Sequence, residues 1–124
     1  MTSTEPDDPR RRVTTTARPW GHFERFVTEE QVTVKTITVL PGCRLSLQRH
    51  RRRSEMWQIL DGPMDVLVGG QAWRADPGEL VWVPRGAPHR IGNPATTPRR
   101  VLEIAFGEFA EDDVERLEDD YSRD

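Results

Sequence analysis

The chain has 124 residues, a formal net charge of −3 at pH 7, and 35% hydrophobic and 31% charged residues. This length suits one domain with its own hydrophobic core. No apolar run approaches the roughly 18 residues of a membrane span, and the acidic balance argues against nucleic acid, whose phosphate backbone requires a broad basic face. The single cysteine, Cys43, permits no internal disulfide, and we expect a cytoplasmic protein without a secretory signal.

The N-terminal segment is polar and rich in Thr, Pro, Asp and Arg. Segments of this composition bury too little apolar surface to fold by themselves. The sequence therefore predicts a disordered tail over residues 1–17 and a single domain over residues 18–124.

After Pro19 the chain consists of short apolar and β-branched runs separated by glycine and proline turns. A Gly-Gly turn at residues 69–70 joins two of these runs as a hairpin. Short strands with such turns at regular spacing are typical of an all-β barrel or sandwich. The predicted strands are residues 32–40, 55–60, 64–68, 71–75, 80–84, 89–92 and 99–106.

Only the C-terminal segment has a helical pattern. Within residues 111–121, Val114, Leu117 and Tyr121 recur at intervals of three and four residues. This spacing places them on one stripe of a helix, and we therefore predict a short C-terminal helix packed on the barrel.

The first of two glycine-bounded motifs begins at Gly42. Five residues separate Gly42 from Gln48, one separates Gln48 from His50, four separate His50 from Glu55, and six separate Glu55 from Gly62. Gln48 and His50 are two apart, so in an extended segment they share a face. Glu55 returns on the next strand, which lets it approach both.

The second motif supplies another histidine. It runs from Gly78 over five residues to Pro84, one residue to Gly86, two to His89 and three to Asn93. In spacing and residue type, the two motifs together resemble those of cupins, which fold as a double-stranded β-helix, or jelly-roll, barrel. The first cupin motif usually has His at the place of Gln48.

Four potential ligands can therefore converge inside one barrel, namely Gln48, His50, Glu55 and His89. The alternative is that the two histidines are ordinary polar residues near loops. A mixed nitrogen and oxygen set suits zinc, manganese, iron, cobalt or nickel, and zinc is the ion that we expect. Metal-dependent oxygenases are a third class with this fold, but they often keep three His plus Glu, and Gln48 argues against them.

The resemblance extends to the cupin domain of type II mannose-6-phosphate isomerases, often fused to mannose-1-phosphate guanylyltransferase and here expected to stand alone. It is carried by "RPWG" (18–21), "LPGCRLSLQRHRRRSEMW" (40–57), "VPRGAPHRIGNP" (83–94) and "EDDVERLEDDYSR" (111–123). In this family Gln at position 48 is normal. The resemblance implies isomerisation of mannose 6-phosphate and fructose 6-phosphate, with Arg53 and Glu55 as catalytic residues.

Several arginines surround these ligands: Arg44, Arg49, Arg51, Arg52 and Arg53. Such a run is often only a solvated turn, but arginine also binds phosphate through paired donors. Of these, Arg53 matches the family motif, and we expect it to anchor the phosphate, with Arg90 second and Trp57 as a wall of the pocket.

Some positions depart from the family pattern. Met56, Arg51 and Arg52 replace histidines, and Ala105 and Phe106 stand where the family often has Gln and a small hydroxyl residue. The changes at Arg51, Arg52, Ala105 and Phe106 favour an alternative, a non-catalytic cupin that binds a sugar or small anion. The proton-transfer base is open between metal-bound water and Glu103, although the favoured alternative for Glu103 is a solvent-side carboxylate paired with an arginine. We also expect a homodimer, because open strand edges are commonly paired.

Overall fold

The structure is a computed structural model that describes residues 7–110 and 112–121. In these residues the strands dominate, and no helix is long and apolar enough to cross a membrane. In chain order the elements are η1 (Pro9–Arg12), β1 (Thr14–Arg18), β2 (Gly21–Arg25), β3 (Val32–Val39), β4 (Leu47–Arg49), β5 (Arg53–Ile59), β6 (Met64–Val68), β7 (Gln71–Ala75), β8 (Leu80–Val83), β9 (His89–Gly92), β10 (Arg99–Gly107) and β11 (Glu115–Glu118).

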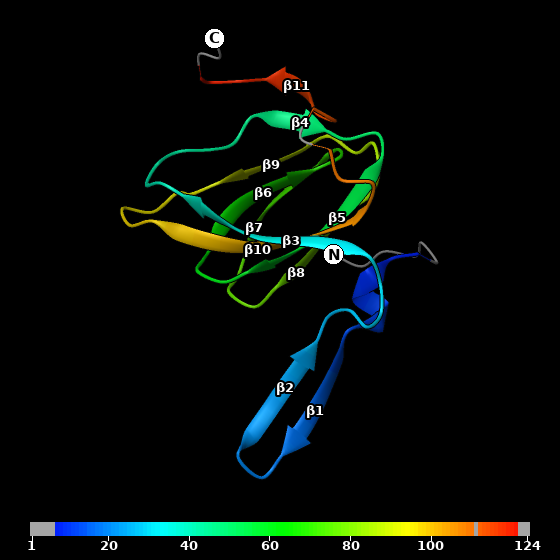
Figure 1. Cartoon of the computed structure of the whole chain (residues 1–124). Helices are drawn as coiled ribbons and strands as arrows, with labels where there is room; N and C mark the ends of the chain where they lie inside the picture. The colour runs from blue at the N-terminus through cyan, green and yellow to red at the C-terminus, as the bar shows by residue number, and fades with distance from the viewer. Residues whose placement is uncertain (1–6, 111, 122–124) are drawn as a thin grey trace.

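Two sheets face each other and form the barrel (Figure 1). One has the order β3-β10-β5-β8, and the other has the order β11-β4-β9-β6-β7. All pairings between their strands are antiparallel. This arrangement confirms the predicted all-β jelly roll.

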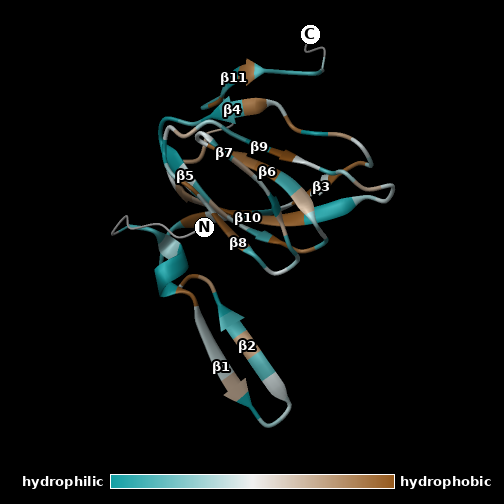
Figure 2. Ribbon diagram, turned by 180° about the vertical axis from the view of Figure 1, so that it is seen from behind, coloured by the Kyte–Doolittle hydropathy of each residue, from teal (hydrophilic) through white to brown (hydrophobic). Residues whose placement is uncertain are grey.

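The hydrophobic core lies between the two sheets because residues alternate along each strand between the interior and the outer face. Trp57 and Ile59 of β5 are buried in it together with Val66 of β6, Ile91 of β9 and Val101 of β10. Figure 2 shows hydrophobic residues concentrated in these two sheets, whereas the hairpin of β1 and β2 is mostly hydrophilic.

The N-terminal segment differs from the predicted disordered tail. Residues 9–12 form η1 and residues 14–18 form β1, which pairs with β2 in a hairpin that projects from the barrel (Figure 1). Asp8 and Pro9 are buried, and η1 contacts β8. The prediction of disorder counted only the apolar residues of the segment itself, whereas the segment is ordered by packing on the barrel. Residues 1–6 lie outside the described residues.

The predicted C-terminal helix is wrong over residues 112–121. Residue 111 is not among the described residues. Here β11 pairs with β4, Glu115 opposite Arg49 and Arg116 opposite Gln48. Ion pairs connect β11 to the barrel, among them the pair between Arg49 Nε and Glu115 Oε2 at 2.8 Å. Leu117, part of the expected helical stripe, is 44% exposed. Tertiary pairing with an open strand edge has overridden a local helical pattern.

Candidate metal centre

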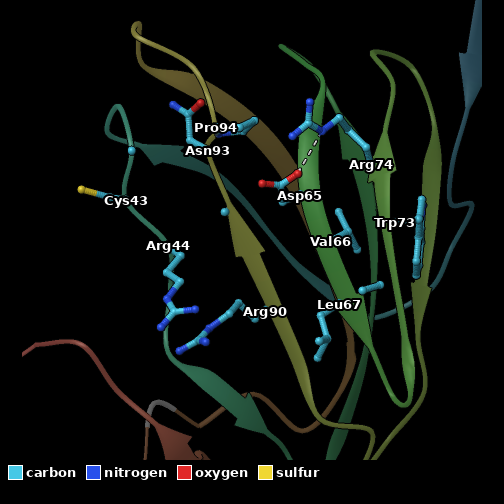
Figure 3. Close-up of a pocket in the computed structure, with 13 residues that line it drawn as sticks. Cys43, Arg44, Asp65, Val66, Leu67, Trp73, Arg74, Arg90, Asn93 and Pro94 are labelled. Atoms are coloured by element: carbon cyan, nitrogen blue, oxygen red, sulfur yellow. Dashed lines mark hydrogen bonds and ion pairs between the residues drawn. The ribbon is translucent and has the colours of Figure 1, made fainter.

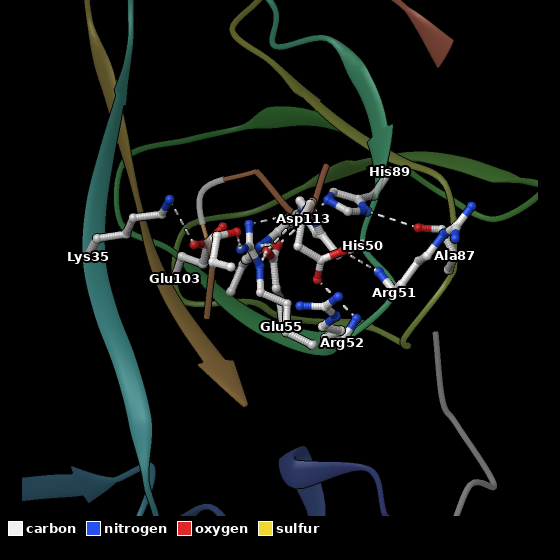
Figure 4. Close-up of polar contacts among 12 residues, drawn as sticks. Lys35, His50, Arg51, Arg52, Glu55, Ala87, His89, Glu103 and Asp113 are labelled. Carbon is white, nitrogen blue, oxygen red and sulfur yellow. Dashed lines mark hydrogen bonds and ion pairs between the residues drawn. The ribbon is translucent and has the colours of Figure 1, made fainter. Parts of the chain in front are cut away.

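Three of the four predicted ligands meet inside the barrel (Figure 4). His50 follows β4, Glu55 lies on β5, and His89 begins β9. All three are buried, and one potential ligand atom from each lies within 4.8 Å of the other two. The sequence motifs therefore converge although 39 positions separate the first of these residues from the last.

Backbone carbonyls orient both imidazoles. His50 Nδ1 lies 2.6 Å from Asp113 O, and His89 Nδ1 lies 2.9 Å from Ala87 O. A carbonyl only accepts, so each Nδ1 carries the proton and donates it. In a neutral ring the other nitrogen, Nε2, is then free to bind a metal.

Both Nε2 atoms face the same carboxylate. His50 Nε2 is 3.2 Å from Glu55 Oε2, and His89 Nε2 is 3.6 Å from Glu55 Oε1. Burial lowers the pKa of His89, which favours its neutral form. Burial by itself would raise the pKa of Glu55, but the two imidazoles lower it to about 2, so the carboxylate is ionised. The Arg53 guanidinium contacts both His50 Nε2 and Glu55 Oε2, and the set of two imidazole nitrogens and a carboxylate also fits a divalent metal ion.

Gln48 lies directly opposite His89 in the pairing of β4 with β9, so both side chains project from the same face of the sheet. It lines, with the three ligands, a cavity of about 60 Å³. Its place as the fourth ligand stays a prediction that this position supports.

Comparison with known proteins now decides the family. Residues 6–119 match the model of the family described as "Mannose-6-phosphate isomerase C-terminal". The chain belongs to this family. It is 37% identical over 107 residues to the alginate biosynthesis protein AlgA of Pseudomonas aeruginosa, and 38% identical over 107 residues to the mannose-1-phosphate guanylyltransferase ManC of Salmonella typhimurium. Each match covers 86% of this chain and 22% of the relative, so the chain spans about a fifth of the relatives' length.

The fold is also similar to a solved structure, the capsular polysaccharide assembling protein CapF of Staphylococcus aureus. The TM-score is 0.65 at 19% identity, over 86% of this chain and 34% of that one. The likeness supports the cupin-like jelly roll.

The departures from the family pattern can now be placed. Met56 is buried on the face of β5 opposite to Glu55, between Trp82 and Ile104 on the neighbouring strands. Its side chain therefore points away from the predicted metal ligands. Ala105 faces inward opposite Glu55 and is 2% exposed, so an apolar methyl group lies where the family often has an amide.

Arg51 and Arg52 are exposed, on the turn between β4 and β5. Their backbone amides donate to the carboxylate of Asp113, at 3.0 and 2.9 Å. These hydrogen bonds lower the pKa of Asp113. They also hold in place the residue whose carbonyl orients His50, so this turn serves the metal centre through its backbone.

Arg53 is buried beside the ligands and its donors are engaged within the protein. Nε donates to Glu55 Oε2 at 3.2 Å, one terminal nitrogen lies 3.3 Å from His50 Nε2, and the other donates to Ala110 O at 3.3 Å. The guanidinium also lies 4.4 Å from the centroid of the Phe109 ring. In this structure Arg53 orients the metal ligands, and its predicted contact with phosphate stays a prediction.

Trp57 lies inside the barrel, whereas the guanidinium of Arg90 lies outside it. Trp57 Nε1 donates to Glu55 Oε1 at 3.1 Å, and its ring meets His89 edge-on, so it forms an interior wall and orients the carboxylate. Arg90 donates to Leu45 O and to Glu118 Oε1, at 2.8 and 3.1 Å. Its guanidinium lies on the outer side of β9 (Figure 3), beside a separate hollow of about 620 Å³.

Two further charged residues, Glu103 and Lys35, line the cavity beside the predicted ligands. Glu103 of β10 faces inward and is 5% exposed, and its Oε2 accepts no hydrogen bond from the described residues. Burial, reinforced by the charge of Glu55, raises the pKa of Glu103 to about 7. Lys35 of β3 lies opposite Glu103 with Nζ 3.4 Å from Oε2. Sequence reasoning flagged Glu103 and missed Lys35, whose only signal was its place in an otherwise uncharged strand.

Proposed function

We propose that the chain is a metal-dependent mannose-6-phosphate isomerase, which interconverts mannose 6-phosphate and fructose 6-phosphate. The observation that carries the proposal is a pair of buried carboxylates with different surroundings. Glu55 is held by two imidazoles, Trp57 and Arg53. Glu103, beside it in the same cavity, has an oxygen, Oε2, that accepts no hydrogen bond from the described residues and lies 3.4 Å from Lys35 Nζ.

Aldose–ketose isomerisation moves one proton between C1 and C2 of the sugar and a second between the oxygens on these carbons. A divalent ion held by His50, Glu55, His89 and Gln48 would polarise the carbonyl group and stabilise the negative charge of the enediolate. Zinc is the ion that we propose, since the set combines imidazole nitrogen with carboxylate and amide oxygen.

Glu103 is the proposed proton-transfer base. Its carboxylate takes the proton from C2 of the aldose and returns it to C1, while the hydroxyl proton on O2 passes to O1. The atoms balance without a co-reactant. Glu103 suits this role because it is buried in the cavity and is not one of the three mutually close ligands.

The test follows the exchange of mannose 6-phosphate with fructose 6-phosphate by zinc-loaded protein. Wild type should catalyse it, and Glu103→Gln should lower kcat by about 100- to 10,000-fold at unchanged metal content. Glu108→Gln is the matched control, since Glu108 is 67% exposed and pairs with Arg52 at the surface. Full activity of the Glu103 variant would reject Glu103 as the base.

A second candidate is a non-catalytic module that binds a sugar phosphate. The inward methyl group of Ala105 favours it, because the family often has a polar amide at this position. Binding of mannose 6-phosphate by wild type without any exchange would select this function over the isomerase.

A further inference from the structure

Lys35 is the only lysine of the chain, and it lies on the interior face of a barrel sheet. Its partner in the pairing of β3 with β10 is Glu103, whose own partner on β5 is the core residue Trp57. Residues paired in this way project from the same face of the sheet. A lysine that projects inward is uncommon, because burying an ammonium group costs free energy unless it is paired.

The side chain of Lys35 connects the cavity with solvent. Nζ lies 3.4 Å from Glu103 Oε2 and 5.2 Å from the centroid of the Phe109 ring, and the side chain remains 40% exposed. Figure 4 shows it reaching from β3 towards Glu103. Within the described part of the chain the ammonium group therefore has one anionic neighbour and an open side, and it lines the same cavity as the predicted metal ligands.

Arg53 offers less to an incoming anion. Its side chain is 7% exposed, and Nε and both terminal nitrogens contact Glu55, His50 and Ala110. To bind phosphate it would have to give up contacts to the metal ligands themselves. Lys35 would only have to turn its flexible end, because an ammonium group binds phosphate as a point charge without fixed geometry.

The charges of the cavity favour a dianion once a divalent ion is bound. Lys35 and Arg53 are balanced by Glu55 and Glu103, and Arg90 is paired with Glu118 outside. A divalent ion therefore leaves a net charge of two positive units, which matches the roughly −1.5 to −2 charge of a phosphate monoester near neutral pH.

The distance across the sheet suits a sugar phosphate. The backbone of Lys35 lies two strands away from β5, which carries the predicted ligand Glu55, or about 10 Å from strand to strand, while Nζ itself lies 3.4 Å from Glu103 Oε2. To hold a phosphate away from the reacting carbons, the flexible side chain of Lys35 turns from Glu103 towards its exposed side. In a hexose 6-phosphate the reacting carbons and the phosphate lie at opposite ends of the molecule. We infer that Lys35 is the phosphate-binding residue of this centre, with the reacting end of the sugar at the metal ligands. This inference rests on the proposed function.

The test uses ligands that cannot isomerise. Calorimetry measures the binding of mannitol 6-phosphate and of mannitol to zinc-loaded protein, together with zinc content and thermal melting. Wild type should prefer the phosphorylated ligand. Lys35→Gln should weaken binding of mannitol 6-phosphate by about 10- to 100-fold and leave zinc content unchanged. Lys35→Arg should restore part of the loss. Arg74→Gln is the charge-matched control, because Arg74 pairs with Asp65 at the surface and is 63% exposed.

Two results would overturn the inference in different ways. If wild type prefers the phosphorylated ligand and folded Lys35→Gln keeps this preference, Lys35 is not the anchor and the proposed function stands. If wild type binds both ligands equally, the sugar phosphate itself is wrong and the proposed function fails with the inference. Loss of the preference in Arg53→Lys alone would assign the phosphate to Arg53.

Discussion

Glu103 should make the metal-free protein less stable as pH rises. Its pKa is raised from 4.5 to about 7 in the folded state, chiefly by burial. The folded chain therefore keeps a proton that the unfolded chain has already lost. Stability is unaffected below pH 4.5, falls between the two pKa values, and stays low above pH 7.

The size of this effect follows from the shift. A difference of about 2.5 pKa units corresponds to about 3 kcal/mol at 1.36 kcal/mol per unit. Glu103→Gln removes the titration and keeps the shape of the side chain. In the presence of a chelator, the variant should match wild type near pH 4 and exceed its free energy of unfolding by up to about 3 kcal/mol at pH 8.

The assay is urea unfolding followed by circular dichroism at several pH values. Lys35→Gln serves as a control, since it removes the neighbouring cation that lowers the pKa of Glu103 and should steepen the decline. Parallel stability curves for wild type and Glu103→Gln from pH 4 to pH 8 would refute the reasoning. Such curves would mean that water or the charge of Lys35 offsets the free-energy cost of burying the ionised carboxylate of Glu103.

Further predictions concern the metal, the turn that supports it, and assembly. His50→Ala and Glu55→Ala should each lose bound zinc while circular dichroism still reports a β fold; wild-type zinc content in both would remove the site. Asp113→Ala should weaken zinc binding about tenfold in a competition assay with a chelator, because the carbonyl that orients the His50 ring loses its anchor; equal affinity would exclude this support. Gly107→Ala should destabilise the fold by at least about 1 kcal/mol in thermal melts, since φ is +109° and an added Cβ would lie 2.6 Å from Arg52 O; an unchanged melting temperature would contradict it. Light scattering should give the mass of a homodimer, and a monomer mass at micromolar concentration would reject the dimer.

The ligands could be predicted from sequence because strand alternation and turn spacing act locally. Gln48 and His50 are two apart, and glycines at both motif ends mark where the strands turn. The C-terminal strand could not be predicted in this way. Its pairing depends on Arg44, Arg49 and Arg90, which lie far away in sequence and meet acidic residues of residues 115–120 only after folding.

The inward direction of Lys35 could not be predicted from the sequence either. In "VTVKTITVL" it shares a row with Thr33, Ile37 and Val39, while the other row also mixes valines with threonines, so polarity does not mark either row as the outer one. The pairing of β3 with β10 turns that row inward, opposite Glu103. Sequence alternation tells which residues share a face but leaves open which face is the interior, and only the partner strand decides this.

The C-terminal segment has a consequence for how fast the centre can exchange its ion. Among the described strands, β11 pairs with β4 only, and all four of its residues are exposed. Edge elements of this kind open by local unfolding far more often than the core does. Yet the stretch just before it supplies the carbonyls of Ala110 and Asp113 that hold Arg53 and His50. Each opening would remove the hydrogen bond that orients the His50 ring while the barrel stays folded. The lifetime of a bound ion would then depend on how often this short strand unfolds locally. A molecule that bound the unfolded strand would lower metal occupancy from outside the barrel.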